Sequence, residues 1–212
     1  MEKQNQKTEY ELQYDKSDKN VSGQNCKDRV ELKKANYQQQ RYIKQLYKRA
    51  FPAAERKPFW LIEKCRKAGV AEVLVVLLNG KMAGLVITAG AGEQMLIDYL
   101  AIDEKYRNIG LGSSVLAAIQ MRFAGKMIIF EIEKTDITAA NNAQRIRRRE
   151  FYRRNGLYFS GEIINAFGTE LELISYNQQV TFSQYMEMYL KIYPKVADYI
   201  TLAGNTRIDG SC

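Results

Sequence analysis

The chain has 212 residues, a formal net charge of +8 and no histidine. Without an imidazole, the Ser-His-Asp triad, the Cys-His pair, His-ligated zinc and a histidine proton shuttle are excluded, so a general acid or base must be Asp, Glu, Lys, Tyr, Cys or water. Hydrophobic residues make up 46% of the sequence, which is enough for the core of a single soluble domain.

The cysteine content and the absence of apolar runs indicate a cytoplasmic protein. Cys26, Cys65 and Cys212 are odd in number and widely spaced, which fits neither a disulfide framework nor a thiolate metal site. The first twenty residues contain no apolar segment, and no run elsewhere is long enough to cross a bilayer. We therefore expect no export, no membrane partner and no metal. The basic charge permits an anionic partner, either nucleic acid or a phosphorylated cofactor.

Composition divides the chain into a polar start, a folded middle and an end. Residues 1–28 are rich in Gln, Asn, Lys, Ser and Asp, so we expect a flexible tail, followed by one domain over 29–193 and a C-terminal tail over 194–212. The hydrophobic pattern predicts, in chain order, a strand at 29–33, helices at 37–50 and 58–68, strands at 72–78, 81–88 and 94–102, a helix at 110–124, a strand at 126–133, a helix at 142–155, strands at 157–164 and 169–176, and a helix at 182–193.

This order of elements predicts a mixed α/β fold. Asn79-Gly80 joins two strands as a type I′ hairpin turn, so the first part of the sheet is antiparallel. The strand, helix and strand over 94–133 form a crossover, which makes the middle pair of strands parallel. We expect a central, mostly antiparallel sheet of about seven strands flanked by helices.

The segment between strand 94–102 and helix 110–124 has the features of a phosphate-binding loop. Arg107, Gly110 and Gly112 follow one another as RxxGxG. The glycines let backbone N–H groups approach a ligand at a helix N-terminus, where the helix dipole favours anions. Neither the P-loop pattern nor the three-glycine dinucleotide fingerprint is present. The loop is therefore expected to bind a pyrophosphate through a motif that differs from both of these.

Two motifs resemble the GNAT superfamily of acyl-CoA-dependent N-acyltransferases. LAIDEKYRNIGLG (100–112) looks like motif A, in which [RQ]xxGx[GA] binds the pyrophosphate of acetyl-CoA, and FYRRNGL (151–157) is similar to motif B. The resemblance covers about residues 29–176. Segments 51–59 and 144–152 are also similar to an uncharacterised branch of bacterial GNAT proteins.

The resemblance implies an N-acetyltransferase, in which a primary amine attacks the thioester of acetyl-CoA directly. It also implies that backbone groups of the strand bind the pantetheine arm, and that the N–H of Leu100 stabilises the oxyanion. The cofactor-binding residues that it implies are Leu100, Ala101, Ile102, Arg107, Asn108, Ile109, Gly110, Leu111, Gly112 and Ser113.

The resemblance also implies catalytic residues. Tyr152 matches the general acid that protonates the departing CoA thiolate. Many members carry a catalytic Glu where this chain has Leu96, so the base is expected elsewhere, with Asp98 or Glu131 acting through a water. Each of these carboxylates could equally be a salt-bridged strand residue. Glu55, in the loop between the first two helices, is expected to line the acceptor site.

An arginine-rich helix leaves a second function open. Arg145 stands where the family frequently has Asn, and six arginines surround the helix: Arg145, Arg147, Arg148, Arg149, Arg153 and Arg154. They form either a solvated surface or a patch that attracts CoA phosphates or an acidic acceptor. The alternative function is a basic RNA- or ribosome-binding module on a vestigial acyl-CoA fold, although the lack of an RNP-like strand or a GxxG loop argues against nucleic acid. The sequence specifies neither the acceptor amine nor a homodimer.

Overall fold

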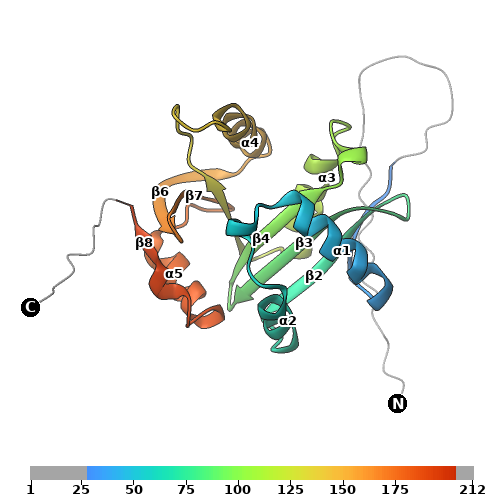
Figure 1. Ribbon diagram of the computed structural model, residues 1–212, viewed down its shortest axis with the longest axis horizontal. Coiled ribbons are helices and arrows are strands. Elements are labelled where there is room, and N and C mark those ends of the chain that lie inside the picture. Colours follow the sequence, from blue (N-terminus) through green and yellow to red (C-terminus); the bar gives the residue numbers. More distant parts are fainter. Residues whose placement is uncertain (1–27, 204–212) are drawn as a thin grey trace, which may run out of the picture. The chain divides into compact units, whose positions relative to one another are not determined.

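A computed structural model of the chain describes residues 28–203 (Figure 1). The tail predicted for residues 1–28 lies, except for its last residue, outside the described residues, as do positions 204–212 of the predicted C-terminal tail. The helices and strands that the structure describes are β1 (Val30–Lys34), α1 (Tyr37–Ala50), α2 (Phe59–Lys67), β2 (Ala71–Leu78), β3 (Lys81–Ala91), β4 (Gln94–Ile102), α3 (Leu111–Arg122), β5 (Met127–Glu133), α4 (Asn142–Arg154), β6 (Tyr158–Ala166), β7 (Thr169–Tyr176), α5 (Phe182–Ile192) and β8 (Ile200–Leu202).

Every predicted helix and strand is present, and the mixed α/β class is confirmed. Asn79 and Gly80 have φ angles of 51° and 78°, as a type I′ turn requires. The strand order is β1-β2-β3-β4-β5-β7-β6-β8. β4 and β5 pair in parallel from Gln94↔Met127 to Ile97↔Phe130, which confirms the predicted crossover.

The sheet has one strand more than the sequence predicted. β8 pairs antiparallel with β6 from Ile164↔Leu202 to Ala166↔Ile200, so the described part of the chain forms eight strands rather than about seven. Ordered structure thus continues beyond Tyr193, where we expected the domain to end. A strand as short as Ile200–Leu202 gives no alternation of polar and apolar residues from which it could be recognised.

The fold divides into two compact units, each assembled from several segments. Among the described residues, the first unit comprises 28–60, 72–87 and 99–124. In this unit α1 buries Ile43, Leu46 and Tyr47, and β1 pairs antiparallel with β2. This unit contains the end of β4 and the start of α3, and therefore the whole predicted phosphate loop.

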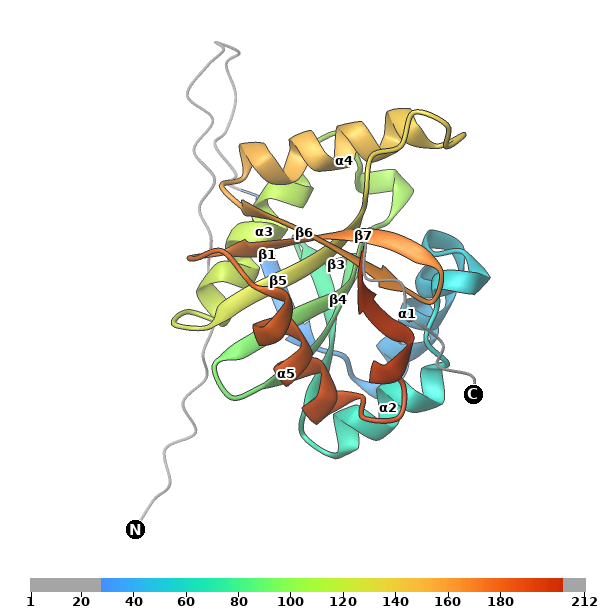
Figure 2. The same cartoon turned by 90° about the vertical axis from the view of Figure 1, so that its left-hand side faces the viewer.

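The second unit comprises 61–71, 88–98 and 125–203 among the described residues. Its core lies between the strands and α5, the orange-red helix below β5 in Figure 2. Leu96 and Ile129 from the sheet and Tyr185, Met188 and Tyr189 from α5 are 0–1% exposed in this core. This unit contains Asp98, Glu131 and Tyr152.

The described residues include no helix that is long and apolar enough to cross a membrane.

Candidate active site

The chain leaves β4 through a turn that Asp103 holds in place. The backbone N–H of Asp103 donates to the Ala83 carbonyl at 2.9 Å, and its buried carboxylate accepts from the N–H of Lys105 at 3.4 Å. From α1, the Arg49 guanidinium and the Tyr42 hydroxyl donate to the same carboxylate at 3.2 Å and 3.3 Å. The predicted phosphate loop therefore starts from a fixed point.

The first turn of α3 presents backbone donors. Gly110 is the N-cap with φ +85°, a left-handed conformation that glycine adopts without strain, and no side chain caps the helix. The N–H groups of Ser113 and Ser114 both donate to the Gly110 carbonyl at 3.1 Å and 3.3 Å. Within residues 28–203, the N–H groups of Leu111 and Gly112 have no acceptor. Such donors at the positive end of a helix dipole suit an anion.

Residues 107–110, which lead into α3, are exposed. Arg107 folds back on the loop, where its Nε donates to the Ile102 carbonyl at 3.1 Å, and its side chain remains 48% exposed. Asn108 is exposed and has φ +62°, and Ile109 is 50% exposed. The segment can therefore reach a ligand in solvent.

The three strand residues expected to bind pantetheine, Leu100, Ala101 and Ile102, are the last residues of β4. Ala101 is buried, whereas Leu100 and Ile102 are half-buried. They are continuous in the chain with the phosphate loop, so one segment of the first unit carries every predicted cofactor contact.

Tyr99 ties β4 to the loop that carries Glu55. Its hydroxyl donates to the Glu55 carbonyl at 3.0 Å and accepts from the N–H of Lys57 at 2.8 Å. Tyr47 of α1 adds a hydrogen bond to the Lys57 carbonyl at 3.0 Å, and its ring packs edge-on against Tyr99 with centroids 4.7 Å apart. The Glu55 side chain itself is exposed. No motif in the sequence indicates that Tyr99 holds this loop.

Asp98 and Glu131 come together at one end of the β4–β5 ladder in the second unit. Each is the next residue after the last paired residues, Ile97 and Phe130. Both carboxylates are half-buried. Leu96, in the position of the expected glutamate, is 0% exposed and packs in the core under α5, so it supplies no chemistry.

Two tyrosines of α5 bind these carboxylates. The Tyr185 hydroxyl donates to Oε1 of Glu131 at 2.6 Å, and the Tyr193 hydroxyl donates to Oδ2 of Asp98 at 2.9 Å. Burial, reinforced by the charge of Glu131, raises the pKa of Tyr185 well above its ordinary value, so its hydroxyl stays a donor. Neither tyrosine was predicted as a site residue from the sequence. The only signal was tyrosine at every fourth position of the predicted helix, which is equally typical of plain core packing.

Tyr152 lies on α4 and is 8% exposed. Its ring contacts Phe130 and Phe151, with centroids 5.3 Å and 5.2 Å away. Burial raises the pKa of Tyr152 to about 12, against the opposing charge of Arg148. The phenol is therefore protonated at every physiological pH.

Most of the arginine cluster is neutralised by ion pairs. Four members pair with three glutamates: Arg145 and Arg148 with Glu133, Arg149 with Glu172, and Arg153 with Glu150. Their separations from the carboxylate oxygens are 2.6–3.0 Å. Only Arg147 and Arg154 are exposed members for which the described residues provide no ion pair. The cluster is mainly a solvated, internally paired helix surface.

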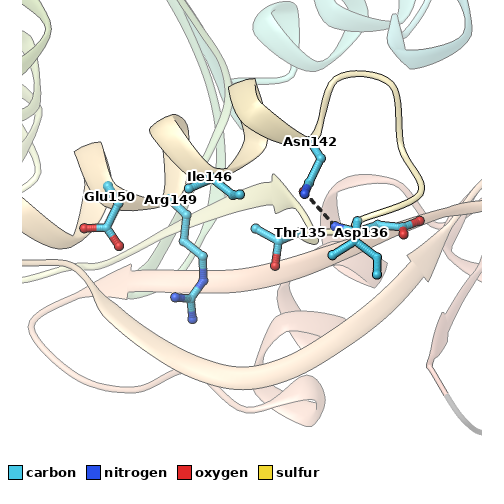
Figure 3. Close-up of a pocket in the computed structure, with 7 residues that line it drawn as sticks. Thr135, Asp136, Asn142, Ile146, Arg149 and Glu150 are labelled. Atoms are coloured by element: carbon cyan, nitrogen blue, oxygen red, sulfur yellow. Dashed lines mark hydrogen bonds between the residues drawn. The ribbon is translucent and has the colours of Figure 1, made fainter.

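A pocket of about 280 Å³ opens beside α4 (Figure 3). The amide of Asn142 accepts from the Asp136 N–H at 3.0 Å at one end, and Arg149 crosses toward β7, where it pairs with Glu172. Its lining residues are Thr135, Asp136, Ile137, Asn142, Ile146, Arg149 and Glu150. They include no predicted catalytic, cofactor or acceptor residue.

Comparisons with known proteins agree with this architecture. Residues 59–156 match the family model described as acetyltransferase (GNAT) domain. No curated protein matches the chain by sequence. A solved structure described as a GNAT-family acetyltransferase from Bacteroides thetaiotaomicron is similar with a TM-score of 0.60 at 16% identity, over 74% of this chain and 92% of the other.

Two further solved structures are similar. A chimera of the Vibrio cholerae spermidine N-acetyltransferase SpeG with hSSAT gives a TM-score of 0.54 at 15% identity, over 69% of this chain and 93% of the other. Arabidopsis thaliana Naa50 in complex with the bisubstrate analogue CoA-Ac-MVNAL gives 0.52 at 18% identity, over 70% of this chain and 99% of the other. At these identities the likeness shows a shared fold.

Proposed function

Because this chain carries a GNAT acetyltransferase domain and has the GNAT fold, we propose that it transfers an acetyl group from acetyl-CoA to a primary amine. The observation that carries the proposal is the start of α3, where the left-handed Gly110 leaves the N–H groups of Leu111 and Gly112 available to an anion. A pyrophosphate is the anion that acetyl-CoA presents. The odd, widely spaced cysteines and the acyl-CoA donor fit a cytoplasmic location.

The first unit supplies donor binding in this proposal. Leu111 and Gly112 offer backbone N–H groups to the pyrophosphate, with Ser113 next to them, while exposed Arg107 adds a positive charge. Leu100, Ala101 and Ile102 bind the pantetheine arm through their backbone groups. The N–H of Leu100 stabilises the oxyanion that forms when the amine attacks the thioester carbon.

The second unit supplies the base. An alkylammonium with a pKa near 10.4 is only about one part in a thousand neutral at pH 7, so a group must take its proton. We assign this to Asp98 or Glu131 acting through a water, because each follows the last paired residues of the β4–β5 ladder and the charges of both act on the Tyr185 hydroxyl. The carboxylate takes one proton from the ammonium, and the neutral amine attacks the thioester carbon. The carbon–nitrogen bond then forms, the carbon–sulfur bond breaks, and the second nitrogen proton passes through water to the departing thiolate.

Tyr152 is proposed to contact the sulfur of CoA as it leaves. With its pKa raised to about 12, donation to a thiolate near 8.5 is uphill by about 3.5 units, or roughly 5 kcal/mol. Complete proton transfer is therefore costly. The contribution that we assign to Tyr152 is a hydrogen bond that stabilises the thiolate as it leaves.

The acceptor is proposed to be a cationic primary amine. Two adjacent carboxylates, Asp98 and Glu131, suit an ammonium group better than a neutral or acidic substrate. One structure of the same fold is described as a spermidine N-acetyltransferase and another holds a CoA-peptide bisubstrate analogue. Polyamines and peptide amino termini are therefore the first classes to test, and Glu55 is proposed to contact them.

The test has two steps on the full chain. Acetyl-CoA at a hundred times its Kd is expected to stabilise the protein by about 2.7 kcal/mol, which raises Tm by roughly 5–10 °C at this size. Thiol release from acetyl-CoA is then measured with spermidine, an aminoglycoside, an amino acid and a short peptide. No Tm shift at millimolar acetyl-CoA, or no release with any amine, would overturn the proposal.

A further inference from the structure

Three tyrosines form a ladder along the buried face of α5. Tyr185, Tyr189 and Tyr193 recur at every fourth residue and are 0%, 1% and 3% exposed. Neighbouring rings lie 5.4 Å and 5.0 Å apart between centroids. Each ring is thus fixed by its neighbour as well as by the sheet, which leaves the hydroxyls little freedom to change direction.

The ends of this ladder point at the two carboxylates that we assign to proton transfer. Tyr185 binds Glu131 at 2.6 Å and Tyr193 binds Asp98 at 2.9 Å. The charges of Glu131 and Asp98 both act on the Tyr185 hydroxyl, as does the hydroxyl of Tyr189. Among residues 28–203, this group thus brings together two phenols from α5, the phenol of Tyr193 at the end of that helix, one carboxylate from β4 and one from β5.

Glu131 and Glu133 lie on the same strand, β5, but their side chains bind different kinds of group. Glu133, two residues after Glu131, is bound by the guanidinium groups of Arg145 and Arg148 at 3.0 Å and 2.9 Å. Two positively charged groups thus hold the Glu133 side chain in place. The hydrogen bond from Tyr185 to Glu131 comes from a neutral phenol, which orients the carboxylate without adding a positive charge.

We propose that Tyr185 and Tyr193 are positioning residues for the general base, which hold the carboxylates of Glu131 and Asp98 in a fixed direction for taking up the amine proton. This inference rests on the proposed function and extends it to α5. A phenol that donates to a carboxylate stabilises the charged state, so removing the donor from Glu131 should raise the pH at which this carboxylate can accept the amine proton.

The experiment is the pH profile of kcat/KM for the full chain, with the panel amine that releases thiol fastest. Tyr185→Phe keeps the ring and removes the donor, so the acid limb is expected to move to higher pH by about one unit. Tyr193→Phe is the parallel variant for Asp98. Met188→Leu changes the same buried face of α5 without touching a hydroxyl, and is expected to change Tm while leaving the pH profile in place.

Double-mutant cycles identify the carboxylate through which each tyrosine acts. If Tyr185 works through Glu131, Tyr185→Phe lowers kcat in the wild-type background and has little further effect in Glu131→Gln. The same holds for Tyr193→Phe in Asp98→Asn. Turnover with an unchanged acid limb in both Tyr→Phe variants overturns the positioning role alone. Absence of turnover with every amine, despite a Tm shift, overturns the proposed function together with it.

Discussion

The phosphate loop and the carboxylate–tyrosine group on α5 draw their parts from the chain in different ways. The loop takes all its groups from one short segment, residues 103–113, and the groups that matter are backbone N–H donors at the start of α3. The second group combines side chains from β4, β5 and α5, and one of its hydrogen bonds joins residues 95 positions apart. A candidate site made of backbone groups can therefore be recognised from residue spacing in the sequence. A site made of side chains from distant segments can be recognised only from the packing of those segments.

The largest effect is expected from a variant of the predicted phosphate loop, the site that is made of local backbone groups. Gly110→Glu places a negative charge and a Cβ where φ is +85°, so it both repels a pyrophosphate and strains the turn. The Tm increase produced by acetyl-CoA, roughly 5–10 °C in the wild type, is expected to vanish. Differential scanning fluorimetry with and without acetyl-CoA measures it.

Gly168→Glu is the matched control. Gly168 has φ +84° in the turn between β6 and β7, and a Cβ there would meet nothing within 4 Å. The variant adds the same charge and the same backbone strain, so it should lose about 1–3 kcal/mol of stability. Its response to acetyl-CoA should remain. Equal loss of the response in both variants would show that strain, and not the site, explains the first result.

Tyr152→Phe is expected to lower kcat by about 10–100-fold, because it removes one hydrogen bond to the departing thiolate, with little change in the acetyl-CoA response. Because the pKa of Tyr152 is raised to about 12, the phenol keeps its proton throughout the usual assay range, and no alkaline limb from this residue should appear below about pH 11. Steady-state thiol release between pH 6 and pH 10 measures both quantities.

Tyr176→Phe serves as the comparison for Tyr152. Tyr176 is 3% exposed on β7, and its ring packs against the same Phe130, with centroids 6.2 Å apart. The variant should cost stability like any loss of a buried hydroxyl, about 1 kcal/mol. It should change kcat by less than about tenfold. A larger loss of kcat from Tyr176→Phe would assign the hydrogen bond to the departing thiolate to Tyr176 instead of Tyr152.

The contrast also explains how much of the molecule the sequence could predict. Element order and the hairpin at Asn79-Gly80 follow from local pattern and are confirmed, whereas the phosphate loop, which its spacing delimits, stays a prediction. β8 was missed because Ile200–Leu202 is too short to show a period. Tyr185 and Tyr193 were missed because a tyrosine at helical spacing looks the same whether its hydroxyl meets a carbonyl or a carboxylate.

A variant of Tyr99 tests whether side-chain packing also positions the loop that is proposed to contact the acceptor amine. Tyr99→Phe removes the hydrogen bonds to Glu55 and Lys57, at 3.0 Å and 2.8 Å, that hold their loop against β4. The KM for the amine should rise about tenfold, since each bond is worth about 1 kcal/mol, while the acetyl-CoA response changes little. Tyr37→Phe, at a side chain 90% exposed, is the matched substitution and should change neither. A rise in KM for acetyl-CoA instead would assign the loop to the donor.

The smallest effect is expected on the arginine helix. Arg147 is exposed and has no ion pair among residues 28–203, so Arg147→Gln should change acetyl-CoA affinity by less than about twofold at 0.15 M salt. Arg148→Gln removes one of the two guanidinium groups on Glu133 and should instead lower stability by about 0.5–1 kcal/mol.

Titration of an RNA oligonucleotide at two salt concentrations tests the alternative function, because RNA binding through this helix would be steeply salt-dependent and weakened by Arg147→Gln. Since four of the six arginines are already paired with glutamates, we expect neither behaviour, and the helix then acts as a support for Tyr152 rather than as a binding surface.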